Sequence, residues 1–241
     1  MEHQTPPALT PATFVLLPGA GGDAWYWHRV TDALEASGHQ VIAVDLPAND
    51  DTAGLGAYVD ATIAAVGDHP PPIVLVAQSM AGLTAPLVCR RLPIHLLVLV
   101  NAMIPMPGES GGEWWEATGQ AQARAELAAR QGRTVTDEID VVGDFFHDAP
   151  AEVIAEAFRR GPLQQSGTPF AEPVPLDGWP DVPTRVLVGR DDRFFPASFQ
   201  RRVARERLAI EPDEIPGGHL LALSQPEELA SRLEGYWSEV R

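Results

Sequence analysis

Residues 73–84 read IVLVAQSMAGLT, and this stretch decides the fold. A run of apolar, largely β-branched residues stops at Ser79, and two alanines, Ala77 and Ala81, lie two positions before and two positions after it. The run is typical of a buried strand, and the residues that follow have a helical pattern. A sharp strand-to-helix turn exposes a serine hydroxyl, and its crowded backbone admits only small side chains at those two positions. The stretch therefore predicts a nucleophilic serine, with a serine that caps the following helix as the alternative.

Outward from this stretch, strand-like and helix-like segments alternate along the chain. Strands are expected at 13–17, 40–46, 73–77, 94–100, 184–188 and 210–215. Helices are expected at 25–36, 53–66, 80–92, 197–207 and 226–240. Because several of the strands are apolar on both faces, this alternation predicts an α/β fold, with a mostly parallel central sheet that is flanked by helices.

The pattern changes between residues 102 and 177, which are rich in helix formers and contain no convincing buried strand. No internal repeat and no long linker interrupts the chain. We therefore expect a single domain over residues 1–241, with a helical cap inserted at 103–177 that covers the ends of the strands.

The composition of the chain argues against several classes of function. The chain has 241 residues and a formal net charge of −16, which argues against nucleic-acid binding and against binding to acidic membrane surfaces. No apolar run approaches the roughly 18 residues that would span a bilayer. The first seven residues lack the basic start and apolar run of a secretory leader, and the one cysteine, Cys89, forms no internal disulfide. These features predict a cytoplasmic protein, and they leave a homodimer open.

A serine needs a base, and His219 is the best candidate. It follows the last predicted strand, where Gly217 and Gly218 let the loop bring an imidazole over the serine. The alternative is an ordinary histidine of a surface loop. The other six histidines are His3, His28, His39, His69, His95 and His147.

The base needs a carboxylate to orient it, and two aspartates follow the strand at 184–188. Asp191 and Asp192 are both candidates, and either could instead be a solvated turn residue. With either one, the chain order is serine, aspartate, histidine, which is the order of the α/β-hydrolase fold. Three candidates in this order, each just after a predicted strand, are unlikely to coincide by chance.

The chain resembles the α/β-hydrolase superfamily, in particular the branch of plant methylesterases, hydroxynitrile lyases and their bacterial relatives. The residues that carry the resemblance are FVLLPGAGGDAWYWHRV at 14–30, SGHQVIAVDLPAND at 37–50, VLVAQSMAGL at 74–83, FFHDAPAEVIAEAFRR at 145–160, DDRFFPASFQ at 191–200 and GGHLLALSQPEEL at 217–229. The resemblance implies that Asp192, rather than Asp191, is the acid. It also implies an oxyanion hole made by the backbone N–H groups of Ala20 and Met80.

The chain departs from this family at a few positions. Pro18 stands where the family usually has a histidine, and alanines replace the usual glycines around Ser79. The hydroxynitrile lyases that resemble this chain carry a threonine where Gly19 stands and a lysine after the catalytic histidine, where this chain has Leu220. The resemblance therefore favours ester hydrolysis over cyanohydrin cleavage.

We expect a serine esterase that cleaves a small to medium, largely apolar carboxylic ester through Ser79, His219 and Asp192 and an acyl-enzyme, without metal or cofactor. A non-hydrolytic enzyme on the same fold, either hydroxynitrile-lyase-like or natural-product-modifying, is the alternative. A ligand-binding protein without catalysis is a further one. The aromatic residues of the cap either line an apolar pocket or pack the cap onto the core. The predicted pocket residues are Gly19, Met103, Trp114, Trp115, Phe145, Phe146 and Leu220.

Overall fold

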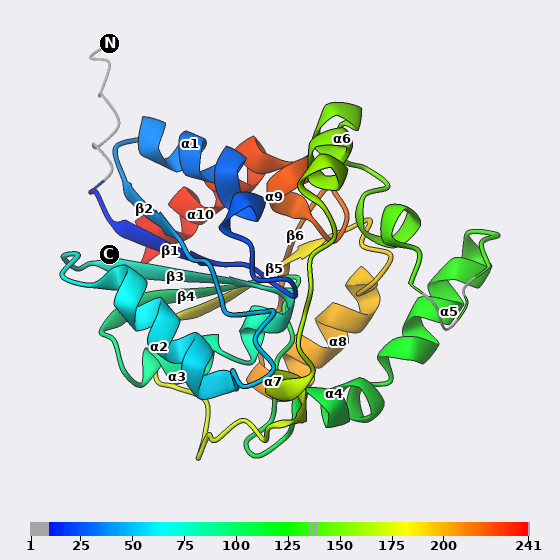
Figure 1. Cartoon of the computed structure of the whole chain (residues 1–241), viewed down its shortest axis with the longest axis horizontal. Coiled ribbons are helices and arrows are strands. Elements are labelled where there is room, and N and C mark those ends of the chain that lie inside the picture. Colours follow the sequence, from blue (N-terminus) through cyan, green and yellow to red (C-terminus); the bar gives the residue numbers. More distant parts are fainter. Residues whose placement is uncertain (1–9, 135, 137–138, 241) are drawn as a thin grey trace, which may run out of the picture.

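The computed structural model describes residues 10–134, 136 and 139–240, and the strands of this part of the chain form one parallel six-stranded sheet (Figure 1). The order across the sheet is β2-β1-β3-β4-β5-β6, and each neighbouring pair is parallel. The α/β-hydrolase fold expected from the sequence is confirmed. The strands are β1 (Thr13–Leu17), β2 (Gln40–Ala43), β3 (Ile73–Gln78), β4 (Ile94–Val100), β5 (Thr184–Gly189) and β6 (Asp213–Ile215).

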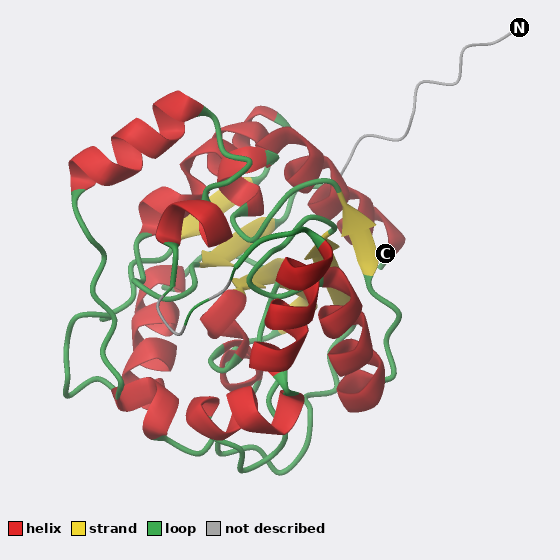
Figure 2. Ribbon diagram, turned by 90° about the vertical axis from the view of Figure 1, so that its right-hand side faces the viewer, coloured by secondary structure: helices red, strands yellow, loops and turns green. Residues whose placement is uncertain are grey.

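Helices cover both faces of the sheet, and Figure 2 shows the strands enclosed between them. Successive side chains of a strand point to opposite faces, so Val15 and Leu17 lie in one apolar core while Phe14 and Leu16 lie in the other. Helices α2, α3 and α8 close the first core, and α1, α9 and α10 close the second. These helices are α1 (His28–Ala36), α2 (Leu55–Val66), α3 (Ala85–Cys89), α8 (Ala197–Leu208), α9 (Leu221–Ser224) and α10 (Pro226–Glu239).

The connection order makes β1 and β3 the switch point of the sheet. The chain adds β2 on one side of β1, then crosses over and adds β3 on the other side. In sheets of this kind, ligands bind beyond the carboxyl ends of the strands at the switch point. Leu17 pairs with Ala77, so the loop after β1 and the turn at Ser79 leave the sheet next to each other.

The segment between β4 and β5, residues 103–177, is called here the inserted segment. Its first helix begins with a capping box, because the Ser110 hydroxyl accepts from the Glu113 N–H and the Glu113 carboxylate accepts from the Ser110 N–H. In Figure 1, α4, α5 and α6 lie beyond the carboxyl ends of the strands. The elements of the segment are α4 (Gly111–Thr118), α5 (Gln120–Arg130), a π-turn (Val141–Phe145), α6 (Ala151–Arg160) and α7 (Thr168–Ala171).

The helix expected at 80–92 does not form as one continuous helix. The chain instead forms a 3-10 turn, Ser79–Gly82, and then the short helix α3. At Gly82 the backbone packs so closely that a β-carbon would lie 1.8 Å from the carbonyl oxygen of Met103. The turn is therefore pinned against the strand end of β4, and the α-helix starts only after it.

Other ends differ by a few residues. The strand expected at 210–215 shortens to β6, because Pro212 has no N–H to donate to a ladder. The strand expected at 40–46 ends at Ala43, and Leu46 instead donates its N–H to the carbonyl of Gly22. Within the described residues, none of the helices is both long and apolar enough to cross a membrane.

Candidate active site

Ser79, His219 and Asp192 form one hydrogen-bonded series at the carboxyl edge of the sheet. The Ser79 Oγ lies 3.0 Å from Nε2 of His219, and Nδ1 of His219 lies 2.7 Å from Oδ2 of Asp192. Ser79 is 9% exposed, His219 2% and Asp192 0%. A serine, an imidazole and a carboxylate in this order can activate the serine oxygen for nucleophilic attack.

Ser79 adopts a strained backbone conformation with φ of 51°. For a residue with a β-carbon, this costs on the order of 1–3 kcal/mol and persists only where the surroundings impose it. The Ser79 carbonyl accepts from the N–H of Met103 at 2.9 Å, which helps to hold the turn. Met80 lies in the first turn of the 3-10 helix, where an N–H has no partner within the helix and can face a ligand.

The structure places Asp192, and not Asp191, against His219. Oδ1 of Asp192 accepts from the N–H groups of Phe194 and Phe195 at 2.8 and 2.7 Å, and Oδ2 faces the imidazole at 2.7 Å and also accepts from Nε2 of Gln200 at 3.3 Å. Asp191 is exposed, and its carboxylate accepts from the Gly217 N–H at 3.2 Å. The two neighbouring aspartates therefore have different tasks in the structure: one faces the imidazole and the other fastens the start of the histidine loop.

Asn101, which the sequence did not single out, joins three of the loops at this edge. It follows β4, is fully buried and has a φ of 46°. Its Nδ2 donates to the carbonyls of Gly218 and His219 at 3.0 and 3.1 Å. Its Oδ1 accepts from the N–H of Gly189 at 2.7 Å and from Nε2 of Gln200 at 3.2 Å. An asparagine tolerates positive φ better than most residues, so both the backbone conformation and the side-chain hydrogen bonds favour asparagine at this position.

Replacing Asn101 with alanine should destabilise the protein by about 2–4 kcal/mol, because several buried hydrogen bonds are lost and the Gly189 N–H is left unpaired. Urea unfolding measures this as a lower midpoint with an unchanged slope. Asn49→Ala, in an exposed turn, is the matched control and should change the free energy of unfolding by less than about 0.5 kcal/mol. Equal midpoints for the two variants would contradict the role given to Asn101.

The inserted segment closes over the histidine loop. Oδ2 of Asp148 accepts from the Gly218 N–H at 2.6 Å. A β-carbon at Gly218 would lie 2.7 Å from Nε2 of His147, so the loop and the segment are in close contact. Burial lowers the pKa of the His147 imidazole, which therefore stays neutral near pH 7.

Aromatic rings surround His219. Its ring centroid lies 5.4 Å from Phe145, 5.3 Å from Phe194 and 5.0 Å from Phe195. Phe145 is a predicted pocket residue and comes from the inserted segment. Phe194 and Phe195 were missed, although their position directly after Asp192 and Arg193 in the sequence could have shown them. His219 thus lies against an apolar wall made by Phe145, Phe194 and Phe195.

The two tryptophans among the predicted pocket residues pack against the phenylalanines near His219. Trp114 is fully buried, packs against Phe195 and Phe199 and donates from Nε1 to the Ile104 carbonyl, so its ring joins the inserted segment to the core. Trp115 is half-buried, with its ring 5.8 Å from Phe194.

Three more predicted pocket residues pack against other parts of the protein. Met103 is buried in the first core. Phe146 packs against Phe158, with ring centroids 6.1 Å apart. Leu220 is partly buried against the second core.

Gly19 lies directly beside the serine. A β-carbon there would come within 2.9 Å of Cβ of Ser79 and within 2.4 Å of Oε1 of Gln78. Gln78 was also missed by the sequence analysis, and its Nε2 donates to the His219 carbonyl at 3.3 Å. Ala20, the next residue after Gly19, is exposed. The loop after β1 therefore reaches the serine with its backbone, as an oxyanion-binding loop requires.

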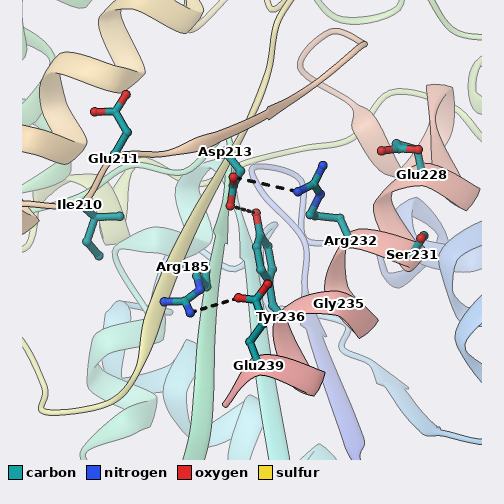
Figure 3. Close-up of a pocket in the computed structure, with 10 residues that line it drawn as sticks. All are labelled: Arg185, Ile210, Glu211, Asp213, Glu228, Ser231, Arg232, Gly235, Tyr236 and Glu239. Carbon is teal, nitrogen blue, oxygen red and sulfur yellow. Dashed lines mark hydrogen bonds and ion pairs between the residues drawn. The ribbon is translucent and has the colours of Figure 1, made fainter. Parts of the chain in front are cut away.

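A cavity of about 560 Å³ lies elsewhere, between β5, β6 and α10 (Figure 3). Two ion pairs lie within its lining, Arg185 with Glu239 at 3.2 Å and Arg232 with Asp213 at 4.0 Å. None of the three residues of the serine series lines it. Its lining residues are Arg185, Ile210, Glu211, Asp213, Glu228, Ser231, Arg232, Gly235, Tyr236 and Glu239.

The part of the chain that the structure describes offers no group of ligands for a metal ion and no reactive thiol. Across residues 10–134, 136 and 139–240, no three or more His, Cys, Asp or Glu side chains are grouped so as to hold a metal ion. Burial raises the pKa of the Cys89 thiol to about 12, so this cysteine stays protonated and unreactive near pH 7.

The sheet order and the serine turn define an α/β hydrolase. The family described as "Alpha/beta hydrolase family" matches residues 14–232. The chain belongs to this family, and to its plant methylesterase-like branch.

Two curated relatives show how far this likeness extends. The chain is 36% identical to a "Probable esterase PIR7A" of Oryza sativa subsp. indica, over 91% of this chain and 94% of that protein. It is also 24% identical to an "Alpha-hydroxynitrile lyase" of Arabidopsis thaliana, over 91% and 95% of the two chains. The family therefore contains relatives named for both hydrolysis and lyase chemistry.

A solved structure shares the fold. The crystal structure of polyneuridine aldehyde esterase superposes with a TM-score of 0.72 at 22% identity, over 93% of this chain and 98% of that one. At this identity the likeness concerns the fold alone.

Proposed function

We propose that the protein is a carboxylic ester hydrolase that uses Ser79 as its nucleophile. The observation that carries the proposal is the hydrogen-bonded series from Ser79 Oγ through His219 to the buried Asp192 carboxylate. The esterases among the relatives of this chain support it.

In the first half of the reaction, the Oγ–H proton of Ser79 passes to Nε2 of His219 while Oγ bonds to the ester carbonyl carbon. The carbonyl oxygen becomes an oxyanion, which accepts hydrogen bonds from the N–H groups of Ala20 and Met80. Asp192 holds the Nδ1 proton and stabilises the imidazolium. The bond from carbon to the alcohol oxygen then breaks, and Nε2 returns its proton to the departing alkoxide.

In the second half, water replaces the alcohol. His219 takes a proton from the water as its oxygen attacks the acyl carbon, and the same two N–H groups hold the second oxyanion. The bond to Oγ breaks, the proton returns to Ser79 from Nε2, and the carboxylic acid leaves. No metal or cofactor takes part in this sequence.

In this proposal the substrate is an apolar ester of small to medium size, and the rings around His219 support its apolar character. Phe145 and Phe194 flank the imidazole, and Leu163 of the inserted segment is exposed and touches the loop after β1 at Gly21. These side chains offer apolar contacts and no charge to the groups on either side of the ester. In this proposal the inserted segment serves as the cap of the site.

The space at Gly19 supports hydrolysis over cyanohydrin cleavage. A threonine there, as in the hydroxynitrile lyases that this chain resembles, would place its β-carbon against Gln78 and Ser79. The residue after His219 is Leu220, which offers no positive charge to cyanide.

A Gly19→Ala variant should lose about 10- to 100-fold in kcat/KM, since small displacements of a positioned nucleophile have effects of this size. Initial rates on a short-chain ester measure the loss. Gly56→Ala, on an exposed turn of α2 where the new β-carbon would meet no atom from outside its own stretch of helix, is the matched control and should keep full activity. Full activity in Gly19→Ala would show that the loop is not held against the serine.

The proposal is tested on the wild-type protein with two substrates in parallel, short-chain p-nitrophenyl esters and mandelonitrile. Rapid release of p-nitrophenol, with no release of cyanide, is the expected result. An initial burst of p-nitrophenol equal to the enzyme concentration would support the acyl-enzyme. Cleavage of mandelonitrile without ester hydrolysis would replace the esterase proposal with the lyase alternative.

A further inference from the structure

A glutamine of the inserted segment holds the loop that follows β1. Oε1 of Gln165 accepts from the N–H of Gly21 at 2.9 Å, across 144 positions of sequence. Its Nε2 donates to the Tyr58 hydroxyl at 3.0 Å and to the Ser166 carbonyl at 2.9 Å. Because a carbonyl only accepts, the nitrogen must face Ser166, and so the amide oxygen faces Gly21.

This contact fixes one side of Ala20, and the backbone fixes the other. The Gly22 N–H donates to the Gly19 carbonyl at 3.1 Å. That carbonyl shares a planar peptide group with the Ala20 N–H, so the bond also sets the direction of this N–H. Gln165 fixes the next peptide group, which joins Ala20 to Gly21. Because both peptide groups are held by hydrogen bonds, the direction of the Ala20 N–H is fixed before a substrate binds.

The stretch that carries Gln165 is itself hydrogen-bonded to the loop that follows β2. The Ser166 N–H donates to the Ala48 carbonyl at 2.6 Å, and the Thr168 hydroxyl donates to the Asp51 carbonyl at 2.7 Å. At the end of α6, Arg160 pairs with Asp23 at 3.0 Å. Residues 160–168 are therefore bonded to the loop that follows β1 and to the loop that follows β2.

We propose that Gln165 is a positioning residue for the oxyanion hole, which deepens the proposed esterase function and rests on it. It acts through the backbone of the loop and does not touch the reacting atoms. Position 18 cannot share this task, because Pro18 has neither an N–H nor a polar side chain. In this chain, docking of the inserted segment through Gln165 thus adds to the local backbone bond in orienting the Ala20 N–H.

The test is Gln165→Leu, which keeps the bulk of the side chain and removes both hydrogen-bonding atoms. We expect kcat to fall about 10- to 100-fold with little change in KM, a part of what the loss of one oxyanion donor costs. Binding of an alkyl boronic acid, whose adduct with the serine places an oxygen in the hole, should weaken by the same factor.

Two further variants separate positioning from mere stability. Gln164→Leu, at the exposed neighbouring position, should leave kcat, KM and boronic acid binding unchanged. Tyr58→Phe removes one anchor of the Gln165 amide and should lower kcat by a smaller factor than Gln165→Leu. A Gln165→Leu protein with a lower melting temperature but an unchanged kcat and boronic acid affinity would overturn the proposal.

Backbone amide exchange keeps this proposal distinct from the esterase proposal. By NMR, the Gly21 amide of Gln165→Leu, which loses its acceptor, should exchange faster with solvent than that of the wild type. Failure of the wild type to hydrolyse any ester would refute the proposed function. Unchanged exchange at the Gly21 amide would refute the positioning role, whatever the wild type hydrolyses.

Discussion

Ser79→Ala should lower kcat/KM for ester hydrolysis by about 10³-fold or more, which makes it one of the two most damaging changes we expect in the chain. The variant removes the oxygen that lies 3.0 Å from Nε2 of His219 and leaves the imidazole, the carboxylate and the loop after β1 in place. Some rate above the uncatalysed reaction should remain, because substrate binding and the oxyanion donors survive. Initial rates and covalent labelling by a fluorophosphonate measure the two effects, and labelling should disappear.

The matched control is Ser198→Ala, which removes an exposed hydroxyl from α8 and should keep full activity and labelling. The melting temperature of Ser79→Ala should stay close to that of the wild type, since alanine retains the β-carbon in the same turn. A folded Ser79→Ala protein that still hydrolyses esters at the wild-type rate would sink the assignment of Ser79 as nucleophile.

Asp192→Asn should lower kcat by about 10⁴-fold, through the tautomer of His219. The N–H groups of Phe194 and Phe195 demand an oxygen at the Oδ1 position, so the new amide nitrogen must take the Oδ2 position against the imidazole. That nitrogen donates to Nδ1, the imidazole then carries its proton on Nε2, and it can no longer accept the proton of Ser79. The loss in kcat should be accompanied by an altered pH profile.

Asp191→Asn is the matched control, one residue away with the same chemical change. Its carboxylate is exposed and accepts from the Gly217 N–H, so a small effect on kcat is expected. If Asp191→Asn were the more damaging of the two, the assignment of the acid would have to be reversed. Circular dichroism of both variants checks that the loop keeps its fold.

The sequence predicted those features that depend on local pattern. The apolar run before Ser79 and the alternation of segments were enough for the parallel sheet. Asp192 and His219 both follow strands, and parallel strands end at one edge, so their approach to the serine follows from topology. The prediction of one continuous helix over 80–92 failed because Gly82 packs closely against the backbone of Met103, which is distant in sequence. This contact favours a 3-10 turn at Ser79–Gly82 before α3 begins.

The residues that hold the site in place could not be predicted in the same way. Asn101, Gln78 and Gln165 have neutral polar side chains that form no motif with their partners. Gln165 lies 144 positions from Gly21, and Asn101 lies 117 positions from Gly218. Their contacts exist only after the sheet and the inserted segment have come together. A partial signal was available only for Phe194 and Phe195, which adjoin the acid in sequence.

Asn101 also governs how the protein should respond to heat. One side chain ties the end of β4 to the start of the acid loop and to the backbone of the histidine loop. The acid loop and the histidine loop should therefore stay in place as long as this end of the sheet is intact. Inactivation on warming should coincide with global melting rather than precede it. Surface changes far from the serine that raise the melting temperature would then lengthen the working life of the enzyme as well.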